Sequence, residues 1–347
     1  MFRLAGLPLL IVDAHAHYVS PSLIEEARRN GRKYGVGVQD LDTGLQQLFF
    51  QHSNARLRPF LPELISLDAR DSYFAKTGID VQVVSTWTDM CGDDLPAEKA
   101  QAWTRLQNDT LAADAKASGG RFVAMGTLAL HDVAVAIQEL DYMSRHLGIN
   151  SIELGTNFNG CDLDDPRLRP MWKKIADVGF LVLLHPPFKP VGLERATDYF
   201  LNNLISYPVD TTIAAARLIF SGLLDEFPSL KICLAHGGGF FPYQVGRFDC
   251  GFASHPACRR VLKKPPSQYL RSFFYDTLTH NDMALDFLSR SAGKDRLIYG
   301  SDYPFEMLDP AGPSRVRAIA GLASVEEAAI LANTACDLLD LKVAEVS

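Results

Sequence analysis

Five side chains able to bind a metal or move protons follow β-rich runs in this sequence. His15 and His17 lie in "LLIVDAHAH", His185 ends "GFLVLLH", His236 ends "LKICLAH", and Asp302 ends "DRLIYGSD". Side chains at positions i and i+2 of a strand point the same way, so His15 and His17 can bind one ion together. Three neutral imidazoles and one carboxylate suit Zn²⁺ best, with Mn²⁺, Co²⁺ and Fe²⁺ as alternatives. The pattern predicts a divalent metal site that activates a bound water.

His236 precedes three glycines at 237–239, which let the backbone approach a ligand closely. Two roles are open for it: a further metal ligand, or a general acid/base beside the activated water. Asp13 and Asp276 lie within expected strands and are predicted to orient the ligands from behind. Glu153, near the end of another strand, can either bridge a second metal or form a buried salt bridge.

Short β-rich runs alternate with helical periodicity along most of the chain. Strands are expected at 9–15, 79–86, 121–128, 149–156, 179–186, 230–238, 272–280 and 295–304, and the clearest helices at 97–118, 131–148 and 211–228. Continuous apolar runs between helices indicate buried parallel strands, and eight β/α units predict a closed α/β barrel of the (β/α)8, or TIM, type. The C-terminal strand ends of such a barrel share one rim, so the chemistry-bearing side chains should meet there. A doubly wound open sheet is the alternative, although no G-x-G-x-x-G follows the first strand.

Residues 18–78 interrupt this rhythm, because they hold no regular β/α pattern and are punctuated by Gly, Arg and Pro. We expect them to be an insertion after the first strand that caps the active-site mouth, where βα loops build barrel sites. A length of 347 residues would also suit two average domains. The strand series favours one barrel domain over residues 1–347.

The composition is that of an ordinary soluble globular protein, with 47% hydrophobic residues, 22% charged residues and a formal net charge of -7. Because there is no dense Lys/Arg block, neither nucleic acid nor an anionic membrane surface is an expected partner. No apolar run approaches the ~18 residues of a membrane span, and the N-terminal run is interpreted as a strand rather than a signal peptide. Six scattered cysteines are compatible with reducing cytosol, so a cytoplasmic location is expected.

Four motifs together resemble the amidohydrolase superfamily, and within it the branch of aminocarboxymuconate-semialdehyde decarboxylase. They are "DAHAH", "LLHPPF", "LAHGGGFFPYQVGR" and "YGSDYPFE", and the likeness runs from about residue 9 to about residue 340. The resemblance implies a distorted (β/α)8 barrel with one catalytic metal, usually zinc, and no organic cofactor. It implies His15, His17, His185 and Asp302 as ligands. It also implies His236 as the catalytic histidine that assists the metal-bound water, with Asp302 sharing its proton.

The resemblance also implies residues that bind substrate. Arg247 matches an arginine that reaches across a homodimer interface to a substrate carboxylate. Arg58 falls where the family has a second carboxylate-binding arginine, with Arg56 as its rival. Phe188 replaces a larger aromatic residue of the family, and Phe305, three residues after Asp302, is predicted to line the same site.

Three functions remain open on this basis. The first is a metal-dependent decarboxylase of a small unsaturated or aromatic carboxylic acid, in the breakdown of aromatic compounds. The second is a hydrolase with the same site that cleaves a C–C bond of a ring-cleavage product, or an amide. The third is a non-catalytic metal-binding barrel, which the presence of an acid/base histidine disfavours.

Overall fold

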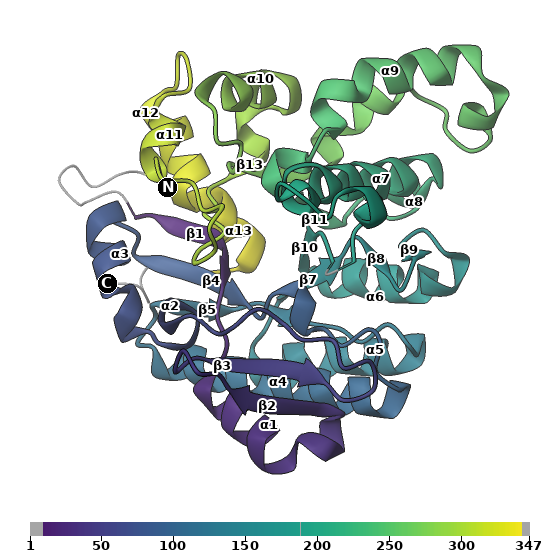
Figure 1. Ribbon diagram of the computed structural model, residues 1–347. Helices are drawn as coiled ribbons and strands as arrows, with labels where there is room; N and C mark the ends of the chain where they lie inside the picture. Colours follow the sequence, from purple (N-terminus) through teal and green to yellow (C-terminus); the bar gives the residue numbers. More distant parts are fainter. Residues whose placement is uncertain (1–9, 188, 342–347) are drawn as a thin grey trace.

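A ring of parallel strands forms the centre of the computed structural model, which describes residues 10–187 and 189–341 (Figure 1). The ring is made of β1 (Val12–His17), β4 (Val81–Ser85), β5 (Phe122–Ala124) continued by β6 (Gly126–Thr127), β7 (Ser151–Gly155), β10 (Leu181–His185), β11 (Lys231–Leu234), β12 (Phe274–Asp276) and β13 (Leu297–Ile298). Each predicted strand segment therefore overlaps a strand, and β1 runs two residues past its predicted end. The third is divided in two.

Hydrogen bonds close the ring, which consists of two sheets. Their strand orders are β1-β4-β5 and β13-β12-β11-β10-β7-β6. The sheets join between β5 and β6, where the amide of Met125 donates to the carbonyl of Val84 at 2.9 Å. On the opposite side, the amide of His17 donates to the carbonyl of Tyr303 at 2.7 Å, and Ala16 forms a parallel bridge with Tyr303. The predicted (β/α)8 barrel is confirmed in distorted form, and the doubly wound alternative is wrong.

Helices cover the outside of this ring (Figure 1). They are α1 (Pro21–Tyr34), α2 (Pro62–Ile65), α3 (Asp71–Thr77), α4 (Ala97–Ala117), α5 (Val133–Tyr142), α6 (Arg169–Val178), α7 (Tyr207–Phe220), α8 (Leu223–Glu226), α9 (Phe241–Ser254), α10 (Asp282–Ala292), α11 (Pro313–Arg317), α12 (Ser324–Ala328) and α13 (Thr334–Leu339). Alternate strand residues such as Val83, Leu183 and Cys233 form one buried cluster with Leu339 of α13. Their neighbours on the strands, such as Val182, pack in a second cluster with the outer helices. No helix in the two described ranges is long and apolar enough to cross a bilayer.

Two of the predicted helices differ in their ends. The helix expected at 211–228 begins earlier, at Tyr207, because Pro208 is tolerated in a first helical turn. It stops before Gly222, whose φ of 76° leaves the helical region, and α8 follows. The helix expected at 131–148 begins after Asp132, which accepts hydrogen bonds from two amides of the first turn. Gly148 ends it with a φ of 67°, in the predicted C-cap position.

The segment 18–78 folds into helices and an antiparallel hairpin of β2 (Val36–Asp40) and β3 (Gln46–Phe50). A second short hairpin, β8 (Asn157–Phe158) and β9 (Cys161–Asp162), lies after β7. Residues of the segment 18–78, including Leu23 and Leu48, share a buried cluster with Trp103 of α4. In Figure 1 the hairpin and α1 lie against α4, which accounts for the ordered structure of a segment without β/α rhythm.

Candidate metal centre

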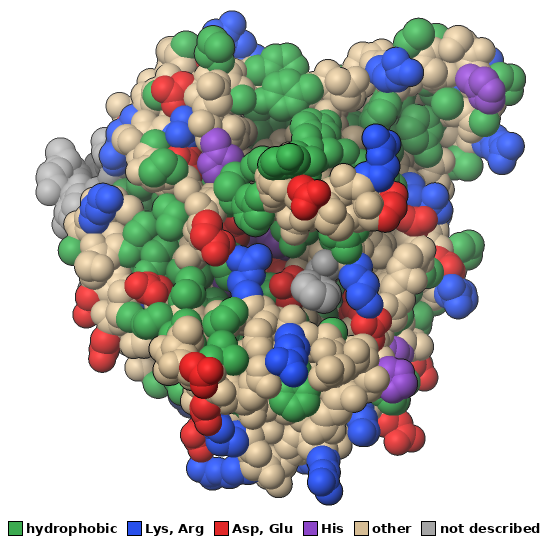
Figure 2. Space-filling view, in the orientation of Figure 1, with side chains coloured by type: hydrophobic (Ala, Val, Ile, Leu, Met, Phe, Trp, Pro, Cys, Tyr) green, Lys and Arg blue, Asp and Glu red, His purple; other side chains and the backbone are tan. Residues whose placement is uncertain are grey.

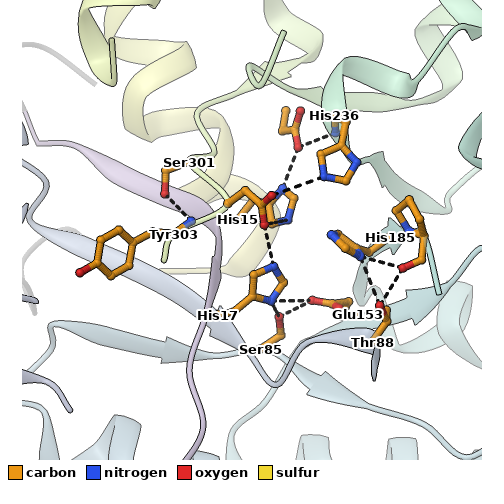
Figure 3. A network of polar contacts seen from close by, with 12 residues as sticks. His15, His17, Ser85, Thr88, Glu153, His185, His236, Ser301 and Tyr303 are labelled. Atoms are coloured by element: carbon orange, nitrogen blue, oxygen red, sulfur yellow. Dashed lines mark hydrogen bonds and ion pairs between the residues drawn. The ribbon is translucent and has the colours of Figure 1, made fainter. Parts of the chain in front are cut away.

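Four predicted ligands converge at the rim of the barrel. One side-chain donor atom each of His15, His17, His185 and Asp302 lies within 4.8 Å of the others, and all four residues are buried. Figure 3 shows the histidines turned toward a shared space. The Nε2 atoms of His15 and His185 are buried there without a hydrogen-bond partner among the described residues. Buried polar atoms are rarely left without a partner, so this group fits a divalent cation.

β1 delivers two of these ligands. The register of its pairing with β4 shifts after Asp13. Beyond this shift, the side chains of His15 and His17 both lie close to the carboxylate of Asp302. The Nε2 of His17 lies 3.1 Å from Asp302 Oδ1, and that of His15 lies 3.7 Å from it. Asp13 instead accepts a hydrogen bond of 2.6 Å from the hydroxyl of Ser301. It therefore ties β1 to the turn that carries Asp302.

Asp302 reaches the group from a turn beyond β13. Its φ of 60° lies in the left-handed region, which is uncommon for residues other than glycine. Its amide donates to the carbonyl of His15 at 2.8 Å, which holds the turn against β1. Conformations of this kind cost about 1–3 kcal/mol and persist where surrounding contacts enforce them, often at functional sites.

Each ligand histidine uses its other ring nitrogen to bind the protein. His15 Nδ1 bonds Asp276 Oδ2 at 2.7 Å. His17 Nδ1 lies 3.3 Å from the hydroxyl of Ser85 and 3.6 Å from Glu153 Oε2. His185 Nδ1 lies 3.0 Å from the carbonyl of the next residue, and 3.4 Å from a threonine hydroxyl. Contacts of this kind fix the orientation of metal-binding imidazoles.

Two buried carboxylates stay ionised here. Burial opposes ionisation of Asp302, but its contacts with His17 and His236 hold its pKa well below the ordinary value. For Asp276 burial is likewise outweighed, mainly by the hydrogen bond with His15, and the pKa is lowered. Burial would lower the pKa of His15, but Asp276 and the charge of Asp302 raise it to about 9. A divalent cation can take the place of the proton on His15, since metal binding displaces protons from its ligands.

Gly300 is needed for the close approach of the strands at this site. A Cβ there would lie 2.7 Å from the Cβ of His15 and 3.1 Å from that of Asp276. We expect Gly300→Ala to lower the unfolding free energy by about 1–3 kcal/mol and to reduce bound metal, since a Cβ cannot move without the strand backbone to which it is attached. Thermal denaturation and elemental analysis measure the two effects.

Gly251→Ala is the control, because its Cβ would meet only Cys258 Sγ at 3.5 Å. A Gly300→Ala variant with unchanged stability and metal content would contradict this reason.

His236 lies beside the four ligands on a tight turn after β11. It has a φ of 56°, and its amide donates to Asp276 Oδ2 at 2.8 Å. Its ring centroid is 5.0 Å from that of His185, and its Nε2 is 3.7 Å from Asp302 Oδ2. Gly239 is required in the same turn, because a Cβ there would lie 2.2 Å from the carbonyl of Pro208, a contact no substitution could avoid without moving the backbone. The glycines therefore serve close packing of the turn that presents His236.

A cavity leads from the surface to these residues, and Figure 2 shows the face on which basic and acidic side chains surround a hollow. Arg58 lines the cavity together with Phe305, and its guanidinium carbon lies 4.9 Å from the centre of that ring. Its Nη1 also contacts Glu306 at 3.1 Å. Arg56 is exposed and forms an isolated bridge with Phe49, away from the lining. The structure therefore brings Arg58, and not Arg56, to the cavity.

Of the other predicted substrate residues, Arg247 does not line this cavity. Arg247 is exposed on α9, which projects from the barrel in Figure 1. Phe188 lies outside the described residues. Asp276 and Glu153 hold ligand histidines, whereas Asp13 acts through Ser301.

The sequence reasoning missed the residues that follow β4. Thr88 donates to the carbonyl of Pro186 at 2.7 Å, and with Trp87 and Asp89 it borders the site. Tyr207 at the start of α7 lines the same cavity. The signal was present in "STWTDM", which holds polar residues at and just beyond the end of an expected strand, where the rim rule applies equally.

The sequence model of the amidohydrolase family matches residues 12–341. The chain belongs to the amidohydrolase family. A Dictyostelium discoideum protein named 2-amino-3-carboxymuconate-6-semialdehyde decarboxylase is 32% identical over 275 residues, which are 79% of this chain and 76% of that protein. This amidohydrolase belongs to the same branch, as its motifs predicted.

Solved structures support the fold of this amidohydrolase. The apo form of Metarhizium anisopliae IDCase aligns with a TM-score of 0.82 at 24% identity, over 96% of this chain and 97% of that one. The 5-carboxyvanillate decarboxylase of Novosphingobium aromaticivorans aligns with a TM-score of 0.78 at 23% identity, over 96% and 97%. That second structure contains manganese and 3-methoxy-4-hydroxy-5-nitrobenzoic acid.

Proposed function

We propose that this amidohydrolase is a metal-dependent decarboxylase of a small unsaturated or aromatic carboxylic acid, without an organic cofactor. The observation that carries the proposal is the buried group of three imidazoles and Asp302, beside His236 and within a cavity lined by Arg58. Two of the relatives are named as decarboxylases, which supports the reaction class. The aromatic acid bound to one of them supports the substrate class.

We propose Zn²⁺ as the native ion, because a buried set of three imidazoles and one carboxylate suits it well. Mn²⁺ is the alternative, and it is the ion in the carboxyvanillate decarboxylase structure. When bound, a divalent cation supplies a Lewis acid that polarises the oxygen atoms it contacts. Elemental analysis of protein purified without added metal, followed by reloading of stripped protein with each ion, tests this assignment.

Arg58 would bind the substrate carboxylate. Its guanidinium is partly buried at the cavity wall, where charge-assisted hydrogen bonds are strong. Phe305 lies under this guanidinium and beside His17, with ring centroids 5.1 Å apart, so it provides an apolar surface for an unsaturated or aromatic body. Asp302 and His236 stand at the inner end of the same cavity, where the reacting carbon would lie.

His236 would hold and deliver the proton. The proton adds to the carbon that bears the carboxylate, and the bond to that carboxylate then breaks. Its electron pair restores the unsaturated system and CO₂ leaves. We expect His236→Gln to lower kcat by about 10²–10⁴-fold with a smaller change in KM, because the imidazole acts in the proton-transfer step. Unchanged metal content serves as the control, and a wild-type kcat would overturn this role.

Release of CO₂ from a panel of benzoic and unsaturated acids, by metal-loaded protein, is the direct test of the reaction. We expect at least one acid to yield CO₂ and the product in which hydrogen replaces the carboxylate. A new carboxylate product without CO₂ would overturn the proposal in favour of hydrolysis of a C–C bond or an amide.

We also propose that the protein acts as a homodimer in which Arg247 serves the site of the partner subunit. It is exposed on α9, and it lines neither of the two cavities that include His236. We expect Arg247→Ala to lower kcat/KM by about 10–100-fold, mainly through KM, because an ion pair with substrate is lost.

Mixed subunits test this sharing. Equal amounts of Arg247→Ala and His185→Ala protomers are unfolded together and refolded. Half of the dimers are then mixed, and each mixed dimer has one intact site. The sample should therefore regain about one quarter of wild-type activity. Activity that stays at the level of the separate variants would contradict shared sites. A monomer at assay concentration in size-exclusion chromatography would contradict the dimer.

A further inference from the structure

Asp89 is a buried carboxylate that the proposed reaction does not use. It lies in the short helical turn Thr88–Met90 directly after β4, and only 8% of it is exposed. It lines the cavity of the metal centre, together with Arg58, His185 and Asp302. Among the described residues it takes part in no ion pair, and the side-chain donor beside it is the indole of Trp87. A buried ionisable group without a fixed partner is costly, so a function is expected at this position.

The indole of Trp87 lies beside this carboxylate and is bonded to it only weakly. The indole Nε1 of Trp87 is buried and completes no hydrogen bond of normal geometry, although Trp87 is only 3% exposed and lines the same cavity. Burial raises the pKa of Asp89, and the Trp87 indole and the charge of Arg58 oppose this shift. The cavity wall therefore presents an acceptor and a donor next to one another, within the electrostatic reach of Arg58.

The opposite side of Asp89 borders a neighbouring cavity of about 270 Å³. Asp93 and Asp94 also line this neighbouring cavity, and Lys189 pairs with Asp94 at 2.7 Å. Lys189 is neutralised by Asp94, and burial raises the pKa of Asp93 to about 7, so none of the described lining residues here offers a free positive charge to a second carboxylate. This side of the site would accept a group that donates hydrogen bonds.

We propose that Asp89 determines substrate specificity by accepting a hydrogen bond from a hydroxyl or amino group on the acid, which Trp87 supports with its indole N–H. The inference rests on the proposed function, since it concerns the acid bound at the metal centre. Asp89 would then select, among such acids, those that carry the donor group at the position facing it. A site built to bond a hydroxyl rejects the analogue that lacks it, because its buried polar groups are then left unpaired.

Binding to matched acids tests the proposal. The probes are 2-, 3- and 4-hydroxybenzoate and 2-, 3- and 4-aminobenzoate, each against the corresponding methoxybenzoate, and the readout is Kd by calorimetry with metal-loaded protein. We expect the wild type to prefer the donor-bearing acid at one ring position by at least about tenfold. In Asp89→Leu this preference should fall to within about twofold, while binding of the methoxy acid changes little.

Two further variants make the result specific. Asp89→Asn retains the shape of the side chain and one acceptor oxygen, so we expect it to keep only part of the preference, and it carries the test if Asp89→Leu fails to fold. Asp94→Asn removes a nearby charge that does not border the metal centre, and it should keep the full preference. An unchanged preference in both Asp89 variants, or no preference for any donor-bearing acid in the wild type, would overturn the inference.

Activity separates this inference from the proposed function. Discrimination that depends on Asp89, without CO₂ release from any acid, would leave the inference standing and refute decarboxylation. CO₂ release with the same selectivity in wild type and Asp89→Leu would support decarboxylation and refute the role of Asp89.

Discussion

Replacing His185 with alanine is expected to reduce bound metal to below about a tenth of the wild-type level and CO₂ release by more than about 10³-fold. His185 is buried, and its Nε2 faces the other ligands without any described partner. Its loss leaves Asp302 and two imidazoles, too few protein ligands for a tightly held zinc. Elemental analysis and a CO₂ assay on the purified variant measure both effects.

The control for this loss is another histidine. His146 is exposed in the helical turn after α5, and it lines neither of the two cavities that include His236. His146→Ala should keep wild-type metal content and turnover. Stripping the wild type with a chelator should reproduce the His185→Ala result, and reloading should reverse it. A His185→Ala variant that keeps its metal and its turnover would refute the ligand set.

Replacing Arg70 with methionine is expected to destabilise the protein by about 3–5 kcal/mol. Arg70 is completely buried and donates to the carbonyl of Glu63 at 2.8 Å, to Gln82 Oε1 at 2.9 Å and to the carbonyl of His17. Methionine fills part of the volume but leaves three acceptors without this donor, two of them buried. Burial lowers the pKa of Arg70 to about 10, so the guanidinium is still charged at neutral pH and its bonds are charge-assisted.

Urea denaturation and metal content measure this effect. Because one acceptor is the backbone of His17, we expect metal affinity to fall as well. Arg28→Met is the matched control, since Arg28 pairs at the surface with Asp40 at 2.6 Å, where ion pairs contribute little. Equal stability of the Arg70→Met and Arg28→Met variants would show that the Arg70 network does not support the site.

The ligand residues were predictable because parallel strands deliver their ends to one rim. His17 is the last residue of β1 and His185 the last of β10, and His236 lies two residues after β11. In the sequence, each of these histidines is found at the end of a hydrophobic run. Asp302 is a less direct case, since it reaches the rim only through a left-handed turn four residues beyond β13.

The substrate side of the cavity was less predictable. Arg56 and Arg58 are two residues apart, so no local pattern separates them. Arg58 lines the cavity because the chain after β3 turns back across the barrel mouth, which depends on the packing of residues 18–78 against α4. Asp89 was not predicted from the sequence, because a single acidic residue in a polar run carries no periodic signal.

Family membership, the strand series and the types of metal-binding side chain follow from the order of residues alone, because hydrophobic period and strand-end motifs are local properties. Three features follow only from tertiary structure: the closure of the ring at Tyr303, the hydrogen bond between Asp276 and His15, and the placement of Asp89 beside Trp87 at the cavity wall. Each of these depends on contacts in which the protein interior removes water from polar groups. Such desolvation is a property of the folded neighbourhood and cannot be read from the residues that flank a position.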